Sequence, residues 1–179
     1  EENIRLRRPD AISHYQDLLT DEIYFYHLDA KDRSEEAKKL RVLLKLAKKQ
    51  KTIVVTSVDA ILRKYIPKKV LLDNIFTYKI GDIIDLEELS QKLVRLGYER
   101  VSRIEGLGQF SIRGGIIDVY SLEYTNPIRI ELFDDEIDSI RTFDVFSQKS
   151  IEKIKKVVIT PSREFIYPED TTSAVEKIQ

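Results

Sequence analysis

The side chains best suited to chemistry in this sequence are four arginines interleaved with two aromatic residues between positions 95 and 113. They are Arg95, Tyr98, Arg100, Arg103, Phe110 and Arg113. A planar guanidinium pairs with carboxylates and phosphates, and a rigid aromatic ring gives much contact area for little entropy. The set is therefore suited to bind either an acidic protein surface or a phosphate backbone. The formal net charge of −1 favours the protein partner, because nucleic-acid-binding domains are usually basic.

Other kinds of chemistry find less support in the sequence. The acids of residues 134–136 and Asp138 could hold a cation, but they fit a solvated hairpin turn better. His14 and His27 have no partner at metal-ligand spacing, and the absence of cysteine excludes disulfides and thiolate chemistry. No glycine precedes Gly81 and no Gly-Lys-Ser or Gly-Lys-Thr occurs, so a phosphate-binding loop is absent. We expect no catalytic centre, cofactor or metal site in this chain.

Arg113 stands directly before the glycine pair Gly114-Gly115, between two strand-like runs at 108–113 and 116–120. A glycine pair within a strand pattern predicts a sharp bend, a bulge or the close approach of another backbone. Two interpretations follow. The bend could present Arg113 to a partner, or it could be a tight corner beside an ordinary solvated charge.

The elements that must position these residues begin with an α/β pattern. We expect a short helix at 11–19 and a strand at 23–28, followed by a helix at 34–49. The apolar run at 52–56 predicts a strand buried on both faces, and Ser57 caps a helix through Leu62. Alternating strands and helices indicate a parallel α/β unit.

From residue 70 onward, the pattern of expected helices and strands changes. A strand-like run at 70–79 leads to a helix that Asp85 caps and Gly97 ends. Only strands follow, and alternating runs with turns between them predict an antiparallel meander. These strands are expected at 98–104, 110–113, 116–120, 128–132 and 137–143.

A buried-strand run at 156–160 resembles the first part of the chain, and a last helix would start at Thr171 or Thr172. The predicted fold is therefore α/β plus α+β, with an antiparallel β-sheet domain carrying one main helix inserted at 69–156. Residues 1–68 and 157–179 form the parallel α/β part. No membrane span or signal peptide is visible, which indicates a cytoplasmic protein, and the absence of methionine suggests a piece cut from a longer chain.

Two long stretches resemble the bacterial transcription-repair coupling factors, the Mfd family. They are residues 108–120, GQFSIRGGIIDVY, and residues 126–144, NPIRIELFDDEIDSIRTFD. The runs at 54–58, VVTSV, and at 160–165, TPSREF, are similar to the same family. The resemblance extends from about Tyr24 to Phe165.

The resemblance implies a non-catalytic N-terminal region that is similar to the excision-repair protein UvrB. The inserted domain would bind UvrA, and the flanking part would be a degenerate, helicase-like half without its nucleotide loop. The whole family protein is an ATP- and magnesium-dependent DNA translocase that displaces stalled RNA polymerase and recruits UvrA during nucleotide excision repair. Carried over by position, Arg100, Phe110 and Arg113 are the expected UvrA-binding residues.

Two alternatives remain beside this interpretation. The chain could be a fragment of UvrB itself, although UvrB proteins carry a further arginine where this chain has Ser111. They also carry a basic stretch where this chain has residues 105–107. The chain could instead be a nucleic-acid-binding module, which would bind DNA with a strong dependence on salt.

Overall fold

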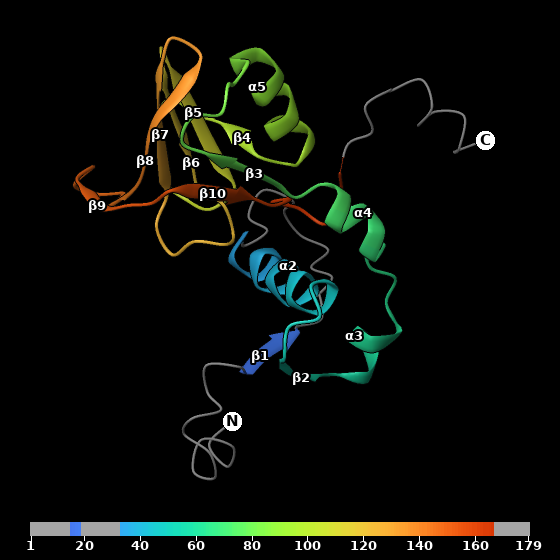
Figure 1. Cartoon of the computed structure of the whole chain (residues 1–179). Coiled ribbons are helices and arrows are strands. Elements are labelled where there is room, and N and C mark those ends of the chain that lie inside the picture. The colour runs from blue at the N-terminus through green and yellow to red at the C-terminus, as the bar shows by residue number, and fades with distance from the viewer. Residues whose placement is uncertain (1–14, 19–32, 167–179) are drawn as a thin grey trace. The chain divides into compact units, whose positions relative to one another are not determined.

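The structure is a computed structural model, and it describes residues 15–18 and 33–166. The chain divides into two compact units, Glu1–Leu72 and Asp73–Gln179. Figure 1 labels the elements of both units. The strand expected at 23–28 and the last helix expected after Thr171 lie outside the described residues. None of the helices in the described ranges combines the length and the hydropathy that crossing a membrane requires.

Among its described residues, the first unit contains a parallel strand pair, formed by the predicted strand at 52–56 and a strand that was not predicted. Strand β1 (Tyr15–Leu18) pairs in parallel with β2 (Ile53–Thr56). The short helix expected at 11–19 is therefore wrong at residues 15–18, because pairing with β2 outweighs a weak local helix preference. The prediction that β2 is buried on both faces is also wrong. Ile53 and Val55 are exposed, since the described part of this sheet is only two strands wide.

The first two helices of the described chain agree with the sequence pattern, and the third does not. Helix α2 (Arg33–Ala47) overlaps the helix expected at 34–49 and buries Leu40 and Leu44. Helix α3 (Val58–Leu62) begins where expected, because the Ser57 side chain accepts a hydrogen bond from the Ala60 amide at 3.3 Å. Helix α4 (Lys68–Asp73) was not predicted. It occupies the first part of the run that the sequence suggested as a strand at 70–79.

The second unit is built on a six-stranded sheet with the order β4-β5-β6-β7-β8-β9. Its strands are β4 (Glu99–Arg100), β5 (Gln109–Arg113), β6 (Ile116–Val119), β7 (Ile128–Phe133), β8 (Glu136–Phe143) and β9 (Ser150–Lys153). The pairs from β5 to β8 are antiparallel, as predicted. Strand β9, which was not predicted, pairs with β8 in antiparallel fashion, and β4 runs parallel to β5. The strand expected at 98–104 shrinks to the two residues of β4.

Helix α5 (Leu86–Arg95) covers one face of this sheet, and Figure 1 shows it beside the strands. Its first turn is capped by Asp85, whose Oδ1 accepts the amides of Glu87 at 2.8 Å and Glu88 at 3.0 Å. Its end is set by Gly97, which adopts a φ of +85°. Both helix boundaries therefore follow from the signals in the sequence.

The core of the second unit lies between α5, the apolar side of the six-stranded sheet and a separate strand pair. This pair joins β3 (Phe76–Lys79) to β10 (Lys156–Ile159) in antiparallel fashion. The buried residues it shares with α5 and the sheet include Leu89, Leu93, Phe110, Ile117, Ile130 and Val157. Tyr98 closes the core by donating its hydroxyl to the Thr160 carbonyl at 2.8 Å, and burial raises the pKa of this phenol.

The mixed α+β character and the antiparallel sheets are thus as predicted. Strand β10 pairs with β3 inside the second unit. The assignment of residues 157–179 to the first part of the chain, and the boundaries of the inserted domain at 69–156, stay predictions. The likeness of the first part to a helicase motor half also stays a prediction.

Candidate functional site

The six-stranded sheet has an apolar face and a polar face, because side chains alternate along each strand. The register aligns Phe110 with Val119 and Ile128 on the apolar side, which α5 covers. The opposite side carries charged and hydroxyl side chains from β5, β6, β7 and β8. This polar face consists of Ser111, Arg113, Asp118, Arg129, Glu131, Ser139 and Arg141.

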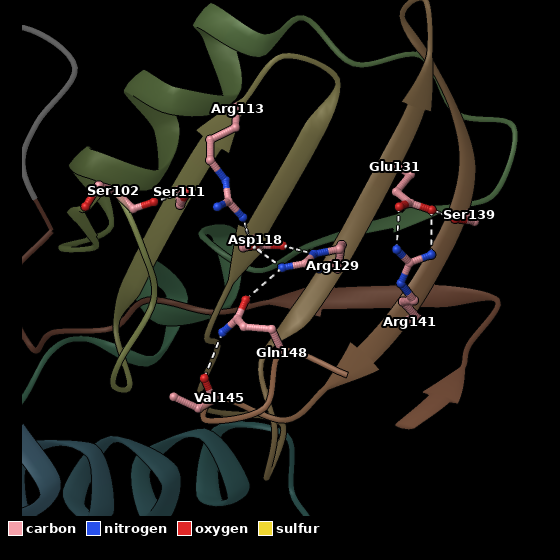
Figure 2. A network of polar contacts seen from close by, with 10 residues as sticks. All are labelled: Ser102, Ser111, Arg113, Asp118, Arg129, Glu131, Ser139, Arg141, Val145 and Gln148. Carbon is pink, nitrogen blue, oxygen red and sulfur yellow. Dashed lines mark hydrogen bonds and ion pairs between the residues drawn. The ribbon is translucent and has the colours of Figure 1, made fainter. Parts of the chain in front are cut away.

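Asp118 is the centre of the polar face. Its carboxylate is only 2% exposed, and it accepts two hydrogen bonds from Arg129, from Nε at 2.7 Å and from Nη2 at 2.8 Å. Arg113 donates a third bond from Nη2 at 2.9 Å. Figure 2 shows the two guanidinium groups converging on Asp118 from neighbouring strands. A carboxylate buried this far is stable only when it is paired and hydrogen-bonded in this way.

Arg129 is held by two further contacts. Its guanidinium lies 4.4 Å from the centre of the Phe143 ring, and its Nη2 donates to the Gln148 side chain at 3.1 Å. Gln148 in turn donates to the Val145 carbonyl at 2.8 Å (Figure 2). Hydrogen bonding to Asp118 raises the pKa of Arg129. Arg129 therefore stays charged and neutralises Asp118.

Arg113 is the outward-facing member of this group. Its side chain is 50% exposed, although one nitrogen is bound to Asp118. The two glycines after it form a two-residue hairpin turn between β5 and β6, in which Gly114 has a φ of +57°. The structure supports part of each interpretation of this bend. The corner is tight, and Arg113 is oriented by Asp118 while half of its side chain stays exposed to a partner.

The second cluster of the polar face joins β7 to β8. Arg141 forms a bidentate ion pair with Glu131, and the Ser139 hydroxyl donates a hydrogen bond to Glu131 Oε2 at 2.8 Å. These bonds, above all those from Arg141, lower the pKa of Glu131. Glu131 therefore stabilises the fold in its ionised form.

Replacing Glu131 with glutamine is expected to make the free energy of unfolding depend less on pH in the acid range. The folded-state pKa is lowered, so the stabilisation is complete above about pH 4.5 and is lost as the pH falls through the folded-state value. Urea unfolding of the parent chain and the variant between pH 7 and pH 3 measures the difference, with the exposed Glu136→Gln as control. A difference that stays constant over this whole range would contradict the assignment.

The three residues predicted to bind a partner occupy different environments. Arg113 lies on the polar face, Phe110 is completely buried in the core, and Arg100 is exposed on the edge strand β4. Arg100 is in register with Phe110, three residues before Arg113, so alternation places the two arginines on opposite sides of the sheet. Arg100 and Arg113 therefore do not share one face of the sheet. A partner would reach both only around the β4 edge.

The sequence interpretation missed Asp118 and Arg129, which hold Arg113 in place. The signal was present as a single acid between Ile117 and Val119, where strand alternation puts it on the same side as Arg113. Arg129 alternates with apolar residues on β7, and its side chain is only 13% exposed because it is bound to Asp118. Within the described ranges, no three acidic or histidine side chains are grouped as a metal site would require.

A family model described as the UvrB interaction domain matches residues 76–165, which is half of the chain. The matched range contains the whole polar face and the sheet that carries it. The chain therefore belongs to the UvrB interaction domain family.

Within that class, the similar curated proteins are transcription-repair-coupling factors. The one from Bacillus subtilis (strain 168) is 43% identical over 143 residues, or 79% of this chain. Those from Staphylococcus haemolyticus (strain JCSC1435) and Staphylococcus aureus (strain MRSA252) are 36% and 35% identical over 87% and 90% of the chain. The chain spans only 12% to 13% of the length of these relatives. The resemblance of the sequence to the coupling-factor family is confirmed.

Proposed function

We propose that this chain is a non-catalytic binding module that docks the UvrA protein on the polar face of its six-stranded sheet. The observation that carries the proposal is the group of Arg113, Asp118 and Arg129. Two positive charges surround one buried negative charge, so the group has an excess positive charge that only Arg113 exposes. An oriented, half-exposed arginine is the kind of residue that dominates binding energy at protein interfaces. The family match and the names of the relatives support UvrA as the partner.

In the longer protein, this module would recruit UvrA to RNA polymerase stalled at a DNA lesion. The motor that consumes ATP with magnesium, and the surfaces for polymerase and DNA, would be supplied by sequence outside this chain. The relatives are named as coupling factors rather than as UvrB, which supports this assignment over a UvrB fragment.

Calorimetric titration of the purified chain with UvrA tests the proposal. Replacing Arg113 with alanine is expected to weaken binding by about 2 kcal/mol, or roughly 30-fold, because it removes an oriented interface arginine. The matched control is Lys156→Ala, which removes an exposed positive charge from β10, outside the six-stranded sheet. Unchanged affinity in Arg113→Ala, or an equal loss in the control, would contradict the proposal.

Two additions sharpen this experiment. Combining Arg100→Ala with Arg113→Ala shows whether UvrA reaches around the β4 edge, in which case the double variant binds more weakly than Arg113→Ala alone. Titration with duplex DNA at two salt concentrations tests the nucleic-acid alternative. Tight DNA binding that falls steeply with salt would favour that alternative over a protein-binding face.

A further inference from the structure

Three side chains on adjacent strands form a row at the end of the sheet near Arg113. Phe133 at the end of β7 is in register with Glu136 at the start of β8, and Ile83 forms a β-bridge to the same Glu136. Paired residues point to the same side of a sheet, so these three side chains share one face. Phe133 is 81% exposed and Ile83 is 69% exposed, whereas Ile84 and Ile137 are buried on the other side. We call Phe133, Glu136 and Ile83 the Phe133 row.

The Phe133 row continues the polar face. Glu131, a member of that face, lies in register with Ile116, the partner of Arg113, and Phe133 follows two residues later along β7. The Leu132 amide donates to the Gly115 carbonyl at 2.8 Å, so the Gly114-Gly115 turn adjoins the end of β7. A partner that binds Arg113 therefore meets the Phe133 row on the same side of the sheet.

Backbone hydrogen bonds hold the row in place. The Gly81 amide donates to the Ile137 carbonyl and the Ile137 amide donates to the Asp82 carbonyl, both at 2.9 Å. The Ile84 amide donates to the Asp135 carbonyl at 2.8 Å. Residues 81–84 thus continue the sheet beyond β8, and Ile83 is fixed before any partner arrives. Such preorganisation lowers the entropic cost of binding.

The chemistry of the row fits one basic side chain. Neighbouring strands are about 4.8 Å apart, so Phe133 and Ile83 stand about 10 Å apart on either side of Glu136. Within the described residues, the Glu136 carboxylate makes no hydrogen bond or ion pair, and Asp134 and Asp135 add negative charge at the adjoining turn. An alkyl stem can lie between the ring and the isoleucine while its cation meets the carboxylate and the ring.

We propose that the protein bound by Arg113 inserts one lysine or arginine side chain between Phe133 and Ile83, where its charge pairs with Glu136. This inference rests on the proposed function and adds a second contact of opposite charge to the same interface. Arg113 recognises an acid of the partner, and the Phe133 row recognises a base. Two contacts of opposite sign fix the orientation in which the partner docks.

Titration of the complete chain with purified UvrA at low and high salt tests the inference. Phe133→Leu keeps the apolar contact but removes the ring, and Glu136→Gln removes the charge. We expect each to weaken binding about fivefold, the scale of a partly desolvated cation–π contact or ion pair. Affinity in Glu136→Gln should also fall less with salt than in the parent chain. The double variant should lose less than the sum of the two, because both residues hold one side chain.

The matched control is Phe146→Leu. Phe146 is 89% exposed and lies in the loop after β8, beyond the end of the sheet that is opposite to Phe133. Urea unfolding checks that the substitutions leave stability within about 0.5 kcal/mol, as expected for exposed sites. If Phe133→Leu and Glu136→Gln bind as the parent does while Arg113→Ala binds weakly, the inference is overturned and the proposed function stands. A loss in Phe146→Leu equal to that in Phe133→Leu would also overturn it, and a parent chain that does not bind UvrA would overturn both.

Discussion

Replacing Asp118 with alanine is expected to lower the free energy of unfolding by about 3 kcal/mol, because it leaves a buried arginine without its counter-ion. Asp118 accepts two bonds from Arg129 and one from Arg113. Arg113 can turn to water when the carboxylate is lost. Arg129 cannot do so easily, because it is 13% exposed and lies against the Phe143 ring.

Urea unfolding at neutral pH measures this loss, and Asp138→Ala, which removes an exposed acid from β8, is the control. A double-mutant cycle with Arg129→Met isolates the pair. Removing both charges should restore part of the stability, since the cost comes mainly from the unpaired guanidinium. A loss below about 1 kcal/mol in Asp118→Ala would show that the group is well solvated instead. The variant should also bind UvrA more weakly, because Arg113 loses the contact that orients it.

Replacing Phe110 with alanine is expected to cost about 4 kcal/mol of stability, since it leaves a cavity in the centre of the core. Phe110 is completely buried and belongs to the cluster that joins α5 to the apolar face. The sequence resemblance placed it among the partner-binding residues. With its ring covered on the α5 side, we expect it to support the interface by holding β5, and so Arg113, in position.

Thermal or urea unfolding of Phe110→Ala gives the stability, and titration with UvrA under folding conditions gives the affinity. The conservative variant Phe110→Leu fills much of the cavity, so it should retain both stability and binding. A Phe110→Leu chain that is stable but fails to bind UvrA would instead indicate that the ring itself contacts the partner.

The local signals in the sequence predicted the elements that depend on neighbouring residues. Asp85 and Gly97 fix both ends of α5, and the alternation of residues 128–132 places β7 correctly in the meander. These boundaries depend on capping and on the period of apolar residues, which a sequence shows directly. Helix α4 was missed because its apolar run, at 70–72, is too short to show a clear period, and short apolar runs suit a strand or a helix equally.

The candidate site was predictable only in part. Arg113 was singled out by its place before two glycines and by family resemblance. Its partners were not, because a buried ion pair depends on which strands become neighbours. Arg129 meets Asp118 only when β6 and β7 pair in the observed register. Arg100 shows the same limit, since a parallel pairing two residues long decides the side on which it emerges.

The pairing of β3 with β10 has a consequence for how this fold can be moved between proteins. Phe76 and Ile159 are register partners, so the first and last residues of the segment between them lie about 5 Å apart. A segment whose ends meet in this way can be spliced into a surface hairpin of an unrelated carrier without stretching either chain. The polar face would travel with it, because every residue of that face lies between these two ends. The polar face is therefore carried by one continuous segment whose two ends are joined by the β3–β10 pair.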